Sequence, residues 1–156
     1  MSIIVKKLSK RYLSADGTET VVFEDFSAEF QDGKVTAVLG PSGVGKSTLL
    51  NCIGRLTSFG GEIVGADEVA YVFQDDRLIP HKTVYGNIEF TLPEASKEEK
   101  ASRIKSVLET VEMTDRASAF PEELSGGQKK RVSLARAFAA KKDVILLDEP
   151  FSSLDL

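Results

Sequence analysis

The chain has 156 residues, of which 42% are apolar and 28% are charged, and its formal net charge is −4. This composition fits an ordinary globular domain with one core, and it excludes collagen-like, disordered and low-complexity chains. The acidic balance argues against a broad nucleic-acid-binding surface, and no apolar run approaches the ~18 residues of a membrane span. Cys52 is the single cysteine, so we expect a small buried thiol in a reducing compartment and no internal disulfide.

The first 34 residues carry the pattern of antiparallel β-structure. Residues 3–5 and 21–23 are short β-rich runs, and the turn-forming cluster at 14–18 between them predicts a hairpin. Apolar and polar residues alternate over 26–30, which indicates a strand with one half-buried face.

A strand, a loop and a helix are expected next. Residues 35–39 form a mostly apolar run, which predicts a strand buried on both faces, and a helix is expected over 47–56. Two further strands are expected at 62–64 and 69–73.

The second half of the chain is mainly helical. Ser96 and Glu99 form a capping-box pattern at the start of one helix, and a second helix is expected after Gly127. The basic run at 129–131 lies on this second helix and predicts a solvated face, not a nucleic-acid or lipid site. The helix leads to an apolar run at 144–147, which predicts a final buried strand. The order of elements indicates an α/β fold with an antiparallel extension and a helical insert.

A glycine-rich loop lies between the strand and the helix that are expected at 35–39 and 47–56. It matches the phosphate-loop pattern, in which glycines let backbone N–H groups converge on an anion at the positive end of a helix. Lys46 can reach the β- and γ-phosphates, and the Ser47 hydroxyl can ligate Mg²⁺. The alternative is a glycine-rich turn with a solvated lysine. The predicted nucleotide-binding residues are Gly40, Pro41, Ser42, Gly43, Val44, Gly45, Lys46, Ser47 and Thr48.

Two adjacent carboxylates follow the apolar run at 144–147. The strand end can place Asp148 beside the Mg²⁺ of the phosphate loop, where an anionic residue would hold the metal directly or through water. Glu149 comes one residue later and can polarise a water molecule for in-line attack on the γ-phosphate. A surface turn is the alternative interpretation of this acidic pair.

The pentapeptide Leu124-Ser125-Gly126-Gly127-Gln128 identifies a family. Followed by a basic helix and an apolar strand that ends in Asp-Glu-Pro, it resembles the signature motif of the ATP-binding-cassette (ABC) ATPase domain, which has a P-loop NTPase core. The resemblance implies that Ser125, Gly126, Gly127 and Gln128 contact the nucleotide held by the other subunit of a dimer. Two chains would then enclose two ATP molecules.

The resemblance assigns three further residues. Gln74 corresponds to the glutamine that senses the γ-phosphate and the metal and couples to the membrane domains. Tyr12 corresponds to the aromatic residue that stacks on adenine, and packing at a strand edge is its alternative role. Asp155 corresponds to the aspartate that reaches across the dimer interface. The expected catalytic residues are therefore Glu149, Lys46 and Gln74, and the expected metal ligands are Ser47, Gln74 and Asp148.

The chain also departs from the family pattern. The pattern continues to a strand that ends in a histidine, whereas this sequence stops at Leu156 and its only histidine, His81, precedes the carboxylates. We therefore expect a C-terminally shortened cassette with weak or no hydrolysis on its own. Within one ABC ATPase domain, the expected parts are a β-subdomain at 1–34, a nucleotide-binding core at 35–82 and 124–156, and a helical subdomain at 83–123.

These features predict an ATP-hydrolysing subunit of an ABC transporter, most similar to the separate subunits of importers. Its cofactors would be ATP and Mg²⁺. Its partners would be a second copy or a paralogous ATP-binding subunit and membrane permease subunits, with no nucleic acid. It would lie at the cytoplasmic face of the membrane as a peripheral subunit, or in the cytoplasm if expressed alone. The alternatives are a nucleotide-binding fragment without hydrolysis and a soluble ABC ATPase that acts on DNA or ribosomes.

Overall fold

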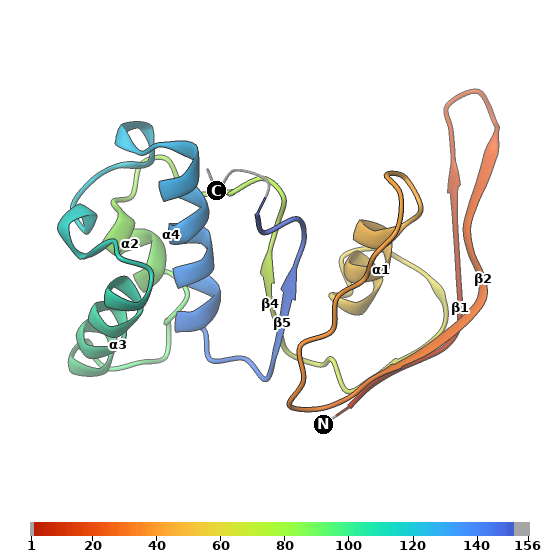
Figure 1. The fold of residues 1–156 in the computed structure, drawn as a ribbon, viewed down its shortest axis with the longest axis horizontal. Helices are drawn as coiled ribbons and strands as arrows, with labels where there is room; N and C mark the ends of the chain where they lie inside the picture. The colour runs from red at the N-terminus through yellow and green to blue at the C-terminus, as the bar shows by residue number, and fades with distance from the viewer. Residues whose placement is uncertain (1, 152–156) are drawn as a thin grey trace. The chain divides into compact units, whose positions relative to one another are not determined.

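The computed structural model describes residues 2–151, and the chain divides into two units, residues 1–69 and 70–156. Figure 1 shows the elements of both units. Within the described residues, no helix combines the length and the apolar character needed to cross a bilayer.

The first unit is built on an antiparallel sheet. Strands β1 (Ile3–Leu13), β2 (Glu19–Phe30) and β3 (Gly60–Val64) lie in the order β2-β1-β3, with both neighbouring pairs antiparallel. The predicted hairpin between β1 and β2 is confirmed. The Ser14 backbone N–H donates to the Thr18 carbonyl oxygen across its turn, and the Thr18 N–H donates to Asp16 Oδ1 within it, each over 2.9 Å. The predicted alternation at 26–30 is also confirmed, because the aromatic and alanine positions are half-buried and the polar ones are exposed.

Helix α1 (Lys46–Ile53) completes the described elements of this unit. Its buried positions are Leu49, Cys52 and Ile53, and the expected burial of the single thiol is confirmed. The helix begins directly after the glycine-rich loop, close to the predicted start at residue 47.

The strand predicted at 35–39 is wrong. These residues have no regular secondary structure, and the side chains of Val35 and Leu39 are 101% and 88% exposed. A strand requires hydrogen bonds to a neighbouring strand, and none of the described strands pairs with this segment. The apolar composition alone therefore does not determine its conformation.

The second unit combines a two-stranded sheet with three helices (Figure 1). Strands β4 (Val69–Val72) and β5 (Val144–Leu147) pair, and between them the chain passes through α2 (Val84–Glu89), α3 (Lys97–Thr110), two short 3₁₀ turns, η1 (Thr114–Arg116) and η2 (Pro121–Glu123), and α4 (Gly126–Ala139). The two strands run in the same direction, and such parallel pairs need a long crossover of this kind.

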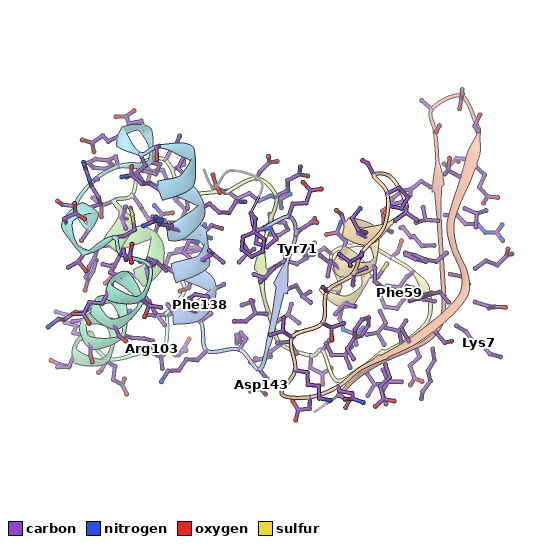
Figure 2. The ribbon with its side chains drawn as sticks, in the orientation of Figure 1. Lys7, Phe59, Tyr71, Arg103, Phe138 and Asp143 are labelled. Atoms are coloured by element: carbon purple, nitrogen blue, oxygen red, sulfur yellow. The ribbon has the colours of Figure 1, made fainter. Side chains whose placement is uncertain are left out.

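Helix α4 packs on two sides. One side joins α2 and α3 in an apolar core that includes Ile88, Ile104 and Val132, all of them 0% exposed. On another side, Ala137 packs against Ala70 and Val72 of β4. Arg103 of α3 also donates to the Ala139 carbonyl oxygen at the end of α4, over 3.3 Å (Figure 2). The helix is thus the element that joins the helical core of this unit to its strands.

The burial predicted for the last strand is only half correct. In β5, Leu146 is 6% exposed, whereas Ile145 and Leu147 are 38% and 40% exposed. Successive side chains of a strand point to opposite faces. Only one face of β5 is therefore covered, and the sequence pattern of four apolar residues does not distinguish this case from a strand covered on both faces.

Candidate functional site

The phosphate-loop residues form a turn that depends on glycine. Gly40, Gly43 and Gly45 have φ angles of +158°, +80° and +106°. The last two lie in the left-handed region that residues with a Cβ adopt only with strain. Gly45 also immediately precedes α1, and a Cβ built on it would lie 2.7 Å from Val22 Cγ1. The conformation at Gly45 therefore requires glycine for both backbone and steric reasons.

Lys46 is the first residue of α1, and its side chain folds back over the loop. The Lys46 ammonium donates hydrogen bonds to the carbonyl oxygens of Gly40 and Pro41, each over 2.9 Å. Ser47 follows in the first turn of the helix. The loop thus holds a cation and the N-terminal N–H groups of a helix in one place, and both attract an anion.

The ends of β4 and β5 bring together two residues that were predicted separately. The Asp148 backbone N–H donates to the Val72 carbonyl oxygen over 2.9 Å, which extends the pairing of the two strands by one residue. Beyond this point the Gln74 amide nitrogen Nε2 donates to Glu149 Oε2 over 3.0 Å. The two side chains are therefore in direct contact at the carboxyl ends of their strands.

The two carboxylates of the acidic pair occupy different environments. Asp148 is 9% exposed, whereas Glu149 is exposed and has a φ of 47°, which is uncommon for a residue with a side chain. Burial, reinforced by the charge of Asp148, raises the pKa of the neighbouring Tyr71, whose ring stacks on that of Phe73 at a centroid distance of 4.2 Å (Figure 2). Tyr71 therefore remains a neutral phenol beside the buried carboxylate throughout the physiological pH range.

The signature residues cap helix α4. The Ser125 hydroxyl accepts from the Gln128 backbone N–H over 3.3 Å, and the Gln128 side chain accepts from the Ser125 N–H over 2.9 Å. This capping box uses the side chains of both residues locally. Helix geometry leaves the N–H groups of Gly126 and Gly127 without intrahelical acceptors. Backbone donors on residues without side chains are thus available for an anion at this end of α4.

Tyr12 lies near the end of β1, opposite Thr20 of β2. Its ring is 43% exposed, and the Lys10 ammonium lies over it, 4.6 Å from the ring centroid. Lys10 is itself held by the Thr57 hydroxyl and by the Ser58 carbonyl oxygen, over 2.8 and 2.7 Å. The exposure and the fixed cation are both compatible with the stacking role predicted for the ring.

The solvated face predicted for residues 129–131 is wrong at one position. Lys130 is 0% exposed, and its ammonium donates to the carbonyl oxygens of Phe73 and Gln74 over 3.0 and 2.7 Å. It also lies 3.4 Å from Asp76 Oδ1. Sequence reasoning missed this contact because the acceptors are far along the chain. The signal available in the sequence was the helical spacing, because Lys130 lies seven residues before Ala137, which packs against β4.

A family model for ABC transporters matches residues 23–152. The chain belongs to the ABC transporter family. The predicted resemblance and the predicted P-loop NTPase fold class are therefore both confirmed. The match includes the phosphate loop, Gln74, the signature residues and the acidic pair.

Curated ABC relatives align with nearly all of this chain. The sulfate/thiosulfate import ATP-binding protein CysA of Ralstonia nicotianae is 40% identical over 173 residues, which cover 99% of this chain and 45% of the relative. The protein with the same name from Pseudomonas syringae is 37% identical, and the match covers 99% of this chain and 52% of that relative. The chain therefore spans about half the length of the curated relatives it matches.

Solved ABC cassettes share the fold. The structure described as the dimeric structure of MJ0796, a bacterial ABC transporter cassette, matches with a TM-score of 0.90 and 31% identity, over 98% of this chain and 76% of the other. A structure of the same cassette in a dimeric post-hydrolysis state, bound to ADP and Pi, matches with a TM-score of 0.89 and 30% identity. The MJ0796 cassette is thus a dimer that binds ADP and Pi in its post-hydrolysis state.

The residues of this ABC chain fit a magnesium nucleotide. The donors at the start of α1 are backbone N–H groups and the Lys46 ammonium, which suit phosphate. Ser47 and Asp148 offer oxygen ligands, which Mg²⁺ prefers. Within residues 2–151 there is no cluster of three or more His, Cys, Asp or Glu residues that could hold a metal. Mg²⁺ is commonly held by one or two protein oxygens together with substrate phosphates, so it does not need such a cluster. The predicted role of Asp155 concerns a residue outside the described part of the chain.

Proposed function

We propose that this chain is the ATP-binding and ATP-hydrolysing part of an ABC importer subunit. One observation carries the proposal: the chain has two glycine-containing helix N-termini, at Gly45–Lys46 and at Ser125–Gly127, and both lie within the residues that the family model matches. The first would bind the phosphates of the chain's own nucleotide. The second would face the nucleotide of a partner chain, as the dimeric ABC cassettes of the same fold suggest.

Each site residue then has a defined task. Lys46, which now donates to Gly40 and Pro41, would exchange these carbonyl oxygens for phosphate oxygens when nucleotide binds. Ser47, Gln74 and Asp148 would hold Mg²⁺, which neutralises phosphate charge when bound. Glu149 would accept a proton from the attacking water as its oxygen bonds to the γ-phosphorus, while the bond from that phosphorus to the β,γ-bridging oxygen breaks and ADP leaves. Gln74 would position Glu149, with which it already forms a hydrogen bond.

The remaining predicted residues act around this centre. Tyr12 would stack on the adenine, while the backbone N–H groups between Gly40 and Thr48 would surround the phosphates. The parts proposed for the domain remain those predicted above, with core segments at 35–82 and 124–156 and a helical subdomain at 83–123. We propose that permease subunits bind the helical subdomain and that the subunit is peripheral to the cytoplasmic face of the membrane.

Two substitutions test the proposal on the full chain. Lys46→Ala should abolish detectable binding of Mg-ATP because it removes the phosphate-binding cation, whereas the control Lys105→Ala, on an exposed part of α3, should bind normally. Glu149→Gln should retain Mg-ATP and lose turnover by about 100-fold or more, as expected for loss of a general base. Its control is Glu94→Gln in an exposed loop. The assays are nucleotide titration and phosphate release.

The results separate the alternatives. Binding and turnover that respond as described support a hydrolytic subunit. Binding of Mg-ATP without turnover in the unmodified chain would favour a nucleotide-binding fragment instead. Full turnover in Glu149→Gln would contradict the role of this carboxylate, and normal nucleotide binding by Lys46→Ala would contradict the phosphate site.

A further inference from the structure

The buried Lys130 connects helix α4, which begins at the signature residues, to the segment that contains Gln74. It lies in the second turn of α4, five residues after Ser125, and the segment that it holds includes Gln74. The hydrogen bonds to Phe73 and Gln74 measure 3.0 and 2.7 Å, which are both within the normal range for an N–H group and a carbonyl oxygen. Helix α4 therefore holds the backbone of Gln74 directly.

The environment of Lys130 makes the loss of this contact destabilising. A buried ammonium is tolerated only when it is hydrogen-bonded and paired with charge. Its charge partner is Asp76, whose side chain is 20% exposed and whose Oδ1 has no hydrogen-bond partner among the described residues. The ammonium thus directs its hydrogen bonds to the backbone at 73–74 and interacts with Asp76 only through its charge. Because the hydrogen bonds go to the backbone and not to Asp76, we infer that they position the backbone at 73–74.

A second residue of α4 holds the other end of the same segment. Arg136 donates to the Arg77 carbonyl oxygen over 2.7 Å, and the Arg77 guanidinium lies over the Phe73 ring, 3.7 Å from its centroid. Residues 73–77 are therefore attached to α4 at both ends. Gln74 lies within this attached segment, and its side chain reaches Glu149.

We propose that Lys130 is a positioning residue for hydrolysis, which acts by fixing the Gln74 backbone so that the Gln74 side chain meets Glu149. This inference rests on the proposed function and extends it. The contact also connects α4, which carries the signature glycines at its start, to the Gln74–Glu149 pair within one chain.

The experiment is a double-mutant cycle on the full chain. Lys130→Met removes the ammonium with little change in side-chain length, and we expect kcat to fall about tenfold, the loss that corresponds to one strong hydrogen bond to a charged group. The KM for Mg-ATP should change less than about twofold because Lys46 and the loop are intact. In a Gln74→Ala background, Lys130→Met should change kcat by less than about twofold, since the side chain through which it acts is absent.

Controls keep a folding defect apart from a positioning effect. Lys105→Met, an equivalent change at an exposed lysine of α3, should leave kcat and KM unchanged. Because Lys130→Met leaves Asp76 without its cation, Lys130→Met with Asp76→Asn should recover thermal stability. It should not recover kcat, since the carbonyl oxygens of Phe73 and Gln74 remain unbound.

Each outcome has one meaning. If Lys130→Met lowers kcat equally with Gln74 intact and in the Gln74→Ala background, or if kcat recovers together with stability, the positioning role is overturned and a structural one remains. An unchanged kcat in Lys130→Met would also overturn it while the proposed function stands. If the unmodified chain neither binds nor hydrolyses Mg-ATP, the proposed function fails, and this inference fails with it.

Discussion

At position 45, both the backbone conformation and the neighbouring side chains require glycine. Its φ is +106°, and an added Cβ would lie 2.7 Å from Val22 Cγ1 and 3.1 Å from Phe23 Cζ. The first distance is shorter than real Cβ contacts, so the Val22 side chain or the loop would have to shift. The start of α1 and the turn before it are therefore set by the absence of one side chain.

We accordingly predict that Gly45→Ala lowers both stability and nucleotide affinity. Left-handed backbone strain and the close contact should together cost about 1–3 kcal/mol of unfolding free energy. Gly17→Ala is the matched control, because Gly17 has a φ of +84° and its Cβ would have no neighbour within 4 Å. Urea unfolding and Mg-ATP titration measure the two effects. Equal destabilisation by both substitutions would show that the contact with β2 does not matter.

The buried thiol of Cys52 makes the stability of the folded chain depend on pH. The thiol is 0% exposed, and burial raises its pKa above the ordinary value. A group whose pKa is higher in the folded state binds a proton more tightly there. Its contribution to stability is complete below the unfolded pKa and is lost as the pH rises through the folded pKa.

The prediction is a loss of stability in alkali that depends on this thiol. Between about pH 8 and 10, the unfolding free energy of the unmodified chain should fall more steeply than that of Cys52→Ala. The comparison uses slopes because Cys52→Ala also removes packing and lowers stability at every pH. Urea unfolding across this pH range gives both slopes. Parallel slopes would show that Cys52 titrates similarly in the folded and unfolded chains.

At the element scale, helices α3 and α4 both begin with a capping box, but the side chain that accepts from the N-cap N–H is a carboxylate in α3 and an amide in α4. In α3 the Ser96 hydroxyl accepts from the Glu99 N–H over 3.3 Å, and the Glu99 carboxylate accepts from the Ser96 N–H over 2.9 Å. In α4 the partner of Ser125 is the uncharged Gln128. Hydrogen bonds from Ser96, the backbone one first, lower the pKa of Glu99. One capping box therefore titrates and the other does not.

We predict that acid weakens the α3 cap selectively. A lowered folded pKa contributes stability above the unfolded value, near 4.5, and this stability is lost as the pH falls through the folded pKa. Glu99→Gln should therefore flatten the decrease in stability below about pH 5, while Ser96→Ala should cost about 1 kcal/mol at neutral pH. Urea unfolding from about pH 3 to 7 measures both. An acid profile unchanged by Glu99→Gln would contradict the titrating cap.

For the whole molecule, signals that are local in sequence were the ones that could be predicted. The capping box at Ser96 and Glu99 and the hairpin around Asp16 follow from neighbouring residues. The strand at 35–39 failed because a strand depends on a partner elsewhere in the chain. Lys130 was placed on a solvated face because its acceptors, at Phe73 and Gln74, lie 57 and 56 positions away.

In the candidate site too, features of one short segment could be predicted from the sequence, whereas a contact between distant segments could not. The glycine pattern before Lys46 and the signature at Ser125 are visible in the sequence because each lies within one short segment. The contact of Gln74 with Glu149 is different, because it depends on the parallel pairing of β4 and β5. The spacing of the two residues gives no indication of it, so the structure was needed to see them as a pair.

The last prediction concerns the dimer that the proposed function requires. Each composite site would use Lys46 of one chain and Gly127 of its partner, so defects in these two residues should complement each other. Gly127→Asp places an acid in the first turn of α4, which favours the helix but repels phosphate. Dimers of either variant alone should be inactive. When Lys46→Ala and Gly127→Asp chains mix at random, half of the dimers contain one chain of each kind. Each such dimer has one intact site of its two, so turnover should recover to about a quarter of the unmodified value.

Phosphate release from the mixture measures this recovery, with sedimentation to confirm that mixed dimers form. Mixed dimers without turnover would show that the phosphate loop and the signature of one chain serve the same nucleotide, or that both sites must be intact. A second mixture separates these cases, in which a chain that carries both Lys46→Ala and Gly127→Asp is paired with an unmodified chain. Such a dimer keeps one complete site only if the two motifs act within one chain. Random mixing also leaves about a quarter of the dimers unmodified, so composite sites predict about a quarter of full turnover, and turnover of about half would contradict them.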